Sequence, residues 1–378
     1  RLMLMIDRFR CALMQLLYDC LQALKLIFTN RSIALTMVLS VGFYGFFYPA
    51  AYQAEHVEHL PLVIVDAEQS PLTHTIIQNT ANSPNIHIYD ITTSFPEAMH
   101  QVKMGRADGI LYLPDNLSQS IHRHETGGIG LYLSGAYLLK TQTVGKGLVS
   151  SLQQTLISEI EKYREISHFH LPPPIHEQPL FNTTAGYGSY LFPAIAPLIV
   201  HQTLLLGVGM LLMEYRTRWL RLTTSRFLAI YVVSGIIGCL SCWFLFGFVY
   251  WHNDYPRGGN FWGMMLATPI FVGAVISLSL VISSYFDRAE RVGQMLIFSS
   301  IPLFLLSGLA YPLLAMPDWL TKIAWLLPST HGIQSFIQLN QMGTPTHLIL
   351  AKLYYLMAVM LLLGTLAYWR LVLKPIKA

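Results

Sequence analysis

The stretch SYLFPAIAPLIVHQTLLLGVGMLLM, residues 189–213, contains no Asp, Glu, Lys or Arg. A helix that crosses the hydrocarbon core of a bilayer needs roughly 20 mostly apolar residues, and this stretch is long enough. Five other stretches with almost no charge lie before and after it: 32–48, 227–250, 261–285, 292–313 and 348–369. The sequence therefore predicts an α-helical polytopic membrane protein with six transmembrane helices.

The composition of the chain supports this class. Of its 378 residues, 53% are hydrophobic and only 12% are charged, whereas a soluble domain carries roughly a quarter charged residues. The net charge of +4 is spread along the chain without a run of Lys or Arg, which argues against nucleic-acid binding. Residues 1–31 are amphipathic and lack the pattern of a cleavable signal peptide.

Basic residues indicate which way the spans run. Most of them fall in segments on one side of the predicted spans: Arg1, Arg8, Arg10, Lys25, Arg31, Arg216, Arg218, Arg221, Arg226, Arg288, Arg291, Arg370, Lys374 and Lys377. The short segments on the opposite side hold only Arg257 and Lys322, with Lys352 at the outer start of the last span. By the positive-inside rule, we expect both termini in the cytoplasm and residues 51–188 outside.

The segment before the first span is predicted to lie on the membrane surface. Between residues 6 and 28, apolar side chains recur at three- and four-residue spacing with polar ones between them, as in an interfacial amphipathic helix. An early transmembrane helix is the alternative, and Asp7, Arg8, Arg10, Asp19 and Lys25 argue against it. We therefore assign residues 1–31 to a cytoplasmic interface helix and 32–50 to the first transmembrane helix.

Residues 51–188 have the alternating pattern of an extracytoplasmic α/β domain between spans one and two. Strands are expected at 62–65, 86–91, 109–113 and 129–133, and helices at 71–79, 94–103, 114–122 and 138–165. Ser70-Pro71 and Ser94 are helix-start signals. The three prolines 172–174 are expected to form a stiff spacer. The domain contains no cysteine and so needs no disulfide.

Residues 189–378 are predicted to form a five-helix transmembrane domain with an outer re-entrant segment at about 314–346. Gly308 and Pro312 interrupt the helical pattern near the outer leaflet, where freed backbone groups need partners. Polar side chains within the spans are few, and each is expected either to line a transport pathway or to bond a neighbouring helix. They are His201, Gln202, Gln294, Ser299 and Ser300.

The sequence lacks the motifs of common catalytic sites. It has no phosphate-binding loop, dinucleotide fingerprint or nucleophile elbow, and Gly145-Lys146-Gly147 is the nearest fragment. The external histidines have no diagnostic metal-binding spacing, and Cys239 and Cys242 are expected to be small apolar filler. We therefore expect no enzyme activity, metal or cofactor in this chain, and energy for any uphill movement has to come from a partner.

The last third of the chain carries three motifs: IPLFLLSGLAYP at 301–312, MPDWL at 316–320 and LPSTHG at 327–332. Together they resemble the type-2 ATP-binding cassette exporter permeases. The external domain is similar too, in VDAEQSPL at 65–72 and in GRADG at 105–109 followed by LPDNL at 113–117. The resemblance covers nearly the whole chain in order. LNQMG at 339–343 most resembles the subgroup that works with periplasmic membrane-fusion proteins in Gram-negative bacteria.

The resemblance implies roles for two groups of residues. The loop 214–226 would contact the nucleotide-binding subunit, although only its Glu and one Arg match the family's E-R-E-x-G-T-L-E pattern, and a loop that merely anchors topology is the alternative. Its coupling residues would be Glu214, Tyr215, Arg216, Thr217, Arg218 and Trp219. The outer gate would comprise Ser307, Gly308, Tyr311, Pro312 and Trp319.

The resemblance also implies a function. The chain would be the permease subunit of an ATP-driven exporter in a bacterial inner membrane, moving an amphipathic or hydrophobic substrate outward. ATP and Mg would bind a separate ATP-binding cassette ATPase subunit, and a second permease would complete the pathway. A periplasmic membrane-fusion protein and an outer-membrane channel would be further partners, besides membrane lipid. The alternatives are a membrane-anchored receptor or scaffold whose external domain binds a ligand or partner, and a membrane-embedded enzyme.

Overall fold

The computed structural model describes residues 2–53, 59–83, 86–123, 128–133, 180–182, 186–218 and 222–374. Contacts divide the chain into two units. The first, which we call the membrane unit, comprises residues 1–53 and 178–378. The second, the α/β unit, comprises residues 54–177.

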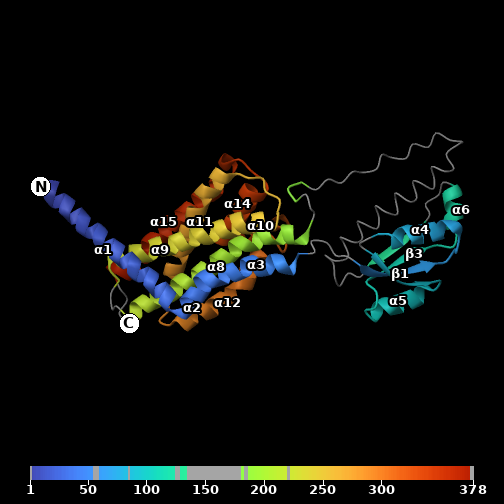
Figure 1. The fold of residues 1–378 in the computed structure, drawn as a ribbon, viewed down its shortest axis with the longest axis horizontal. Coiled ribbons are helices and arrows are strands. Elements are labelled where there is room, and N and C mark those ends of the chain that lie inside the picture. The colour runs from blue at the N-terminus through green and yellow to red at the C-terminus, as the bar shows by residue number, and fades with distance from the viewer. Residues whose placement is uncertain are drawn as a thin grey trace. The chain divides into compact units, whose positions relative to one another are not determined.

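The membrane unit is a helix bundle built around α8 (Tyr187–Arg218), which contacts helices on several sides (Figure 1). Besides α8, its long helical runs are α1 (Leu2–Thr29), α11 (Phe261–Ser283), α12 (Ala289–Leu306) and three runs that contain a π-helical turn. These three are α2 (Arg31–Ala34) with η1 (Leu35–Leu39) and α3 (Ser40–Ala51), α9 (Thr224–Trp243) with η4 (Phe244–Val249), and α15 (Leu350–Tyr368) with η8 (Trp369–Leu373). The first half of α1 projects beyond the other helices. Short elements join the long ones: α10 (Tyr250–His252), η5 (Leu313–Ala315), α13 (Asp318–Leu326), α14 (Pro328–Phe336), η6 (Ile337–Gln341) and η7 (Thr346–Ile349).

Seven helices in the described part of the chain are long and apolar enough to cross a membrane. Six of them overlap the spans expected from the sequence, and the seventh is Phe9–Thr29 within α1. This segment qualifies by length and composition because the charges of α1 gather near its start, leaving Asp19 and Lys25 further along. The count of six is therefore not confirmed; the chain is a mostly helical polytopic protein with about seven candidate spans.

The fifth expected span, 292–313, is wrong at its C-terminal end. The helix α12 stops at Leu306, because Gly308 adopts φ +85°, a left-handed conformation that ends a helix. A short 3₁₀ turn, η5, follows after a break in the helical pattern. The apolar run thus continues past the point at which the helix ends.

The α/β unit contains a four-stranded sheet in the order β2-β1-β3-β4. Its strands are β1 (Leu60–Asp66), β2 (Ile86–Thr92), β3 (Gly109–Leu113) and β4 (Gly130–Leu133), with β1, β2 and β3 parallel and β4 antiparallel. One face of the sheet packs on α4 (Pro71–Ala81) and α6 (Leu117–His122), and the other on α5 (Phe95–Lys103). The central strand β1 is buried on both faces, which explains its unbroken apolar run.

The strands and the three helices described in this unit confirm the expected order, with ends shifted by a few residues. One detail was wrong: α5 begins directly after Ser94, but the Ser94 side chain makes no capping hydrogen bond. The helix expected at 138–165 and the proline spacer at 172–174 lie outside the described residues. Among the residues that are described, no group of three His, Cys, Asp or Glu side chains is placed to hold a metal ion.

The motif VDAEQSPL acts as a start signal for α4. The Asp66 carboxylate, which is buried, accepts hydrogen bonds from the Gln69 backbone N–H (2.8 Å) and the Thr73 hydroxyl (3.0 Å). Ser70 and Thr73 form a reciprocal capping box. The Glu68 carboxylate accepts from the Ser118 backbone N–H of α6 at 2.9 Å. The motif therefore joins β1 to the first turns of both helices on one face of the sheet.

Thr73→Val should destabilise the start of α4, because it removes half of the capping box and one partner of a buried carboxylate. We expect a loss of about 1–3 kcal/mol. Hydrogen exchange of the α4 amides in the full-length chain measures it, as faster exchange by about fivefold or more. Thr75→Val is the matched control, because its hydroxyl bonds only to the Pro71 carbonyl of its own helix. Equal exchange in the two variants would contradict this role for Thr73.

Candidate functional site

The residues expected to couple the chain to an ATPase lie at the end of α8. Glu214 accepts hydrogen bonds from Arg218 Nε at 2.7 Å and from Asn30 Nδ2 at 3.2 Å. Asn30 itself caps α2 through the backbone N–H groups of Ser32 and Ile33. Glu214 therefore ties the end of α8 to the junction of α1 and α2.

The next two residues also hold neighbouring helices. Tyr215 is buried, and its hydroxyl donates to the Asp19 backbone carbonyl at 3.5 Å. Arg216 donates through Nη1 to the Phe286 carbonyl at 2.9 Å, in the connection between α11 and α12. Only Thr217 and Arg218 are exposed, and Trp219 lies outside the described residues. Part of the expected coupling segment is thus internal, and Thr217 and Arg218 are its accessible described members.

Asp19 entered the sequence analysis only as a charge that argues against an early transmembrane helix, and no contact was expected of it. It lies on α1 with only 3% of its surface exposed, 3.8 Å from Arg226 Nε at the start of α9. Gln15 Nε2 donates to the same carboxylate at 3.2 Å. A buried charge requires such partners, because its desolvation is costly. The polar face assigned to α1 therefore includes one side chain that packs inward and joins α1 to α8 and α9.

The polar residues within the spans do not share one surface of the protomer. His201 is 1% exposed, with its ring 6.4 Å from that of Phe271. Neither nitrogen of His201 and neither amide atom of Gln202 has a hydrogen-bond partner within the described part of the chain. On α12, Gln294 is exposed and Ser299 and Ser300 are half-buried. The structure thus separates an inner polar pair on α8 from a more accessible set on α12.

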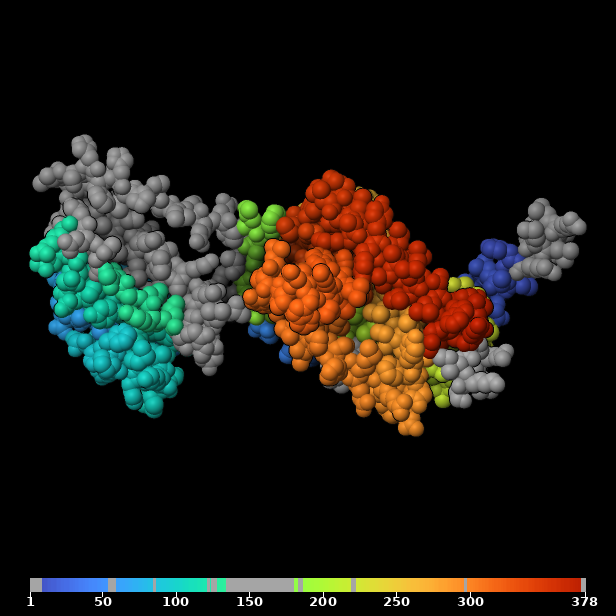
Figure 2. Space-filling view, turned by 180° about the vertical axis from the view of Figure 1, so that it is seen from behind, coloured from blue at the N-terminus to red at the C-terminus, as the bar shows by residue number. Residues whose placement is uncertain are grey.

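Side chains of α14 bond to the backbone at the C-terminal end of α12. The Ser307 hydroxyl donates to the Phe304 carbonyl (2.6 Å), while Thr330 Oγ1 donates to the Leu306 carbonyl (3.2 Å) and Gln334 Nε2 to the Ser307 carbonyl (3.1 Å). These bonds satisfy carbonyls that the end of α12 leaves without helical partners. Ser307 and Gly308 therefore lie at a helix junction, whereas Tyr311, Pro312 and Trp319 are exposed. The orange segment with α12 and α13 lies at the molecular surface in Figure 2.

His331, within the motif LPSTHG, joins α14 to α13 and α15. Its ring stacks on Tyr355 with centroids 4.0 Å apart, and its Nε2 lies 2.7 Å from the Trp325 carbonyl. Burial lowers the pKa of His331 below its ordinary value, the hydrogen bond to Trp325 opposes this shift, and nearby Lys352 adds to it. The ring is therefore favoured in its neutral form, which suits a packed aromatic contact.

Two comparisons with known proteins agree with this architecture. A family model described as ABC-2 family transporter protein matches residues 31–369. The chain is also similar to ABC transporter G family member 20 of Dictyostelium discoideum, with 23% identity over 313 residues, which cover 77% of this chain. The matched region spans 41% of the length of that relative.

Removing the charge of Asp19 should loosen the junction of α1, α8 and α9. Asp19→Asn removes the buried charge that faces Arg226, and we expect a loss of about 1–3 kcal/mol in the free energy of unfolding, less than for a fully buried pair because Arg226 is partly exposed. Thermal unfolding of the purified chain in detergent measures it.

Asp287→Asn is the control for this change, because Asp287 forms an exposed pair with Arg291 at 2.8 Å at the start of α12. Such a pair contributes about 0–1 kcal/mol. If both variants unfold like the unmodified chain, Asp19 does not hold the junction together.

Proposed function

The chain belongs to the ABC-2 family of transporter proteins, and on that premise we propose that it is the permease subunit of an ATP-driven exporter. A separate nucleotide-binding subunit would bind the ATP and Mg that power transport. The substrate is an amphipathic or hydrophobic molecule that moves out of the cytoplasm or the inner membrane. The single observation that best supports this proposal is the set of contacts at the end of α8.

These contacts suit mechanical coupling. Glu214 holds the α1–α2 junction, Tyr215 contacts α1, and Arg216 holds the connection between α11 and α12. Asp19 adds the start of α9 through Arg226. A force applied to the segment after Arg218 is therefore transmitted to several helices at once. An ATPase that docks there through Arg218 and Thr217 would move the bundle as a connected set.

We propose that two permeases pair and that the accessible face of α12, with Gln294, Ser299 and Ser300, contributes to the pathway between them. When α8 and α11 shift, the side chains of His201 and Gln202 would bond to the substrate or to other polar groups of the protein. In the described structure the polar side-chain atoms of these two residues are buried without hydrogen-bond partners, so this packing of α8 costs free energy. The segment around Ser307, Gly308, Tyr311, Pro312 and Trp319 would act as the outer gate.

We place the protein in a bacterial inner membrane with both termini in the cytoplasm, on the basis of the positive-inside pattern. In this orientation the α/β unit, including the sheet that VDAEQSPL helps to organise, is periplasmic. It would dock a membrane-fusion protein and, through it, an outer-membrane channel. This assignment is supported by the motif resemblance.

Arg218→Ala should uncouple ATP hydrolysis from transport, because Arg218 is the accessible charge at the end of the contact set. In membranes reconstituted with the partner ATPase, we expect substrate export to fall about tenfold while the complex still assembles. Arg291→Ala is a close control, since Arg291 is similarly exposed and forms a similar i,i+4 ion pair. Normal export by Arg218→Ala would exclude a coupling role for this residue, and failure of any ATPase to copurify would overturn the exporter proposal.

His201→Leu separates a role in transport from a role in folding. Because neither ring nitrogen has a partner in the described structure, the apolar side chain should raise the melting temperature slightly, by the equivalent of about 1 kcal/mol or more. Export should fall nonetheless, if the ring meets substrate during the cycle. Thermal unfolding and export are measured on the same preparation. A more stable variant that exports normally would remove His201 from the pathway.

A further inference from the structure

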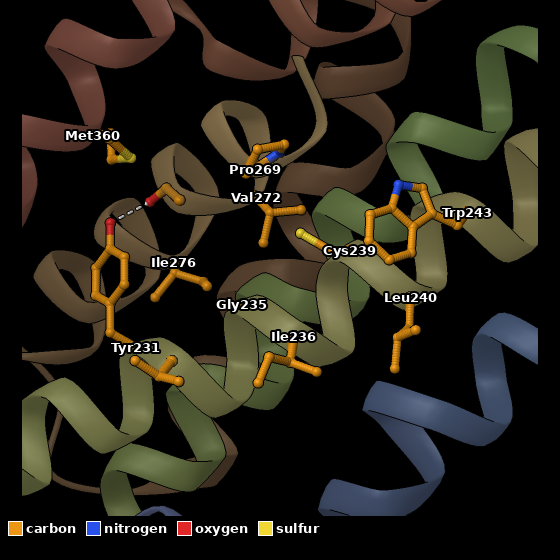
Figure 3. A pocket seen from close by; sticks show the side chains of 12 residues that line it. Tyr231, Gly235, Ile236, Cys239, Leu240, Trp243, Pro269, Val272, Ile276 and Met360 are labelled. Carbon is orange, nitrogen blue, oxygen red and sulfur yellow. Dashed lines mark hydrogen bonds between the residues drawn. The ribbon is translucent and has the colours of Figure 1, made fainter. Parts of the chain in front are cut away.

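A long apolar groove runs between α9 and α15, with α11 as its floor. We call it the α9–α15 groove; it is formed by residues within 227–243 of α9, 269–276 of α11 and 360–368 of α15. Two adjoining hollows of about 370 Å³ each make it up, and both are lined by Tyr231 and Met360. Figure 3 shows the hollow that extends from Tyr231 past Gly235 and Cys239 to Trp243.

The polar groups in the groove are satisfied within the protein. The Tyr231 hydroxyl donates to the Gly273 carbonyl at 2.8 Å, the dashed line in Figure 3, and lies 2.6 Å from the Ser277 hydroxyl. Ser277 in turn donates to the Met360 carbonyl at 2.9 Å. These bonds hold α9, α11 and α15 together and use the hydrogen-bonding capacity of the floor. A polar ligand would therefore find little to bond, whereas a hydrocarbon chain loses nothing there.

The shape of the groove fits an extended chain. Along α9, the distance from Phe227 to Trp243 is about 24 Å at roughly 1.5 Å per residue, a large part of the ~30 Å hydrocarbon core. Gly235 keeps the middle of the groove deep, because a Cβ built on it meets no atom within 4 Å. An occupant that fills this length supplies van der Waals contacts that the lining side chains otherwise lack.

The charge at one end of the groove indicates which kind of lipid fits. The groove ends at Tyr368, whose hydroxyl lies 2.9 Å from that of Thr224. Arg370 and Lys374 follow on the same chain segment, and no carboxylate of the described residues lies within ion-pair distance of either. Arg370 instead contacts the Ser284 hydroxyl and the Tyr285 ring. A phosphate group near this end would complement the two cations.

We propose that the α9–α15 groove holds an acyl chain of an anionic phospholipid, whose head group lies near Arg370 and Lys374. The lipid fills the space between three helices of one protomer. It is a lipid bound to the membrane unit and is distinct from the exported substrate. Its binding does not depend on the exporter proposal.

The test uses the full chain in lipid nanodiscs that contain phosphatidylglycerol or phosphatidylcholine with a photoactivatable diazirine on the acyl chain. Labelled peptides are located by mass spectrometry. We expect the α9 peptide containing Gly235 and Trp243 to be labelled at least fivefold more than the exposed apolar face of α3, which carries Phe43 and Phe47. Phosphatidylglycerol should label it about threefold more than phosphatidylcholine.

Gly235→Leu should fill the groove and reduce labelling of α9 to the level of α3. Gly247→Leu is the matched control, because its Cβ also meets nothing within 4 Å and it lies on the same helical run outside the groove. Labelling of α9 no greater than that of α3 in the unmodified chain would overturn the proposal, whether or not the variant folds. Cross-links from the groove to a second protein chain would also overturn it, and equal labelling by the two lipids would overturn the assignment of an anionic head group.

Discussion

The membrane unit depends on one constraint: within hydrocarbon, each backbone N–H and C=O has to find its partner inside the protein. Continuous helices meet this requirement over most of the unit. Where α12 stops, the constraint has to be met by side chains, and Thr330 and Gln334 of α14 donate to the Leu306 and Ser307 carbonyls. The short helix α14 thus completes the backbone bonding of a helix that precedes it. The C-terminal end of α12 and the start of α14 are therefore expected to move together rather than independently.

At the other end of the unit, the end of α8 contacts several neighbouring segments through consecutive side chains. Glu214, Tyr215 and Arg216 are consecutive on α8, and each contacts a different neighbouring segment. Because successive helical residues point in different directions, a single turn reaches several partners. Asp19 and Arg226 extend the same contact set to α9. In the proposed function, in which another subunit supplies the energy, a displacement at the end of α8 would reach several helices at once.

Hydropathy and spacing were sufficient to predict the helical membrane class, six of the candidate spans and the order of strands and helices described in the α/β unit. The motif VDAEQSPL was visible as a pattern, and the structure supplies its reason in the bonds of Asp66 and Thr73. Other features were not accessible from one sequence. Asp19 has the spacing of a surface residue, and only the position of Arg226 on a distant helix reveals its burial. The groove beside Gly235 likewise forms only where α15 packs against α9 and α11, which lie much earlier in the chain.

The early end of α12 has a consequence for the surrounding membrane. Its 18 residues span about 27 Å at roughly 1.5 Å per residue, slightly less than the ~30 Å hydrocarbon thickness of an average bilayer. Much of the helix is exposed in the protomer, including Phe298 and Ile301. Lipid that borders it has to thin, or a neighbouring protein surface has to replace that lipid, and each ångström of mismatch costs a fraction of a kcal/mol. The stability of this face is therefore tied to bilayer thickness, so that membranes of different chain length favour different arrangements of the same helix.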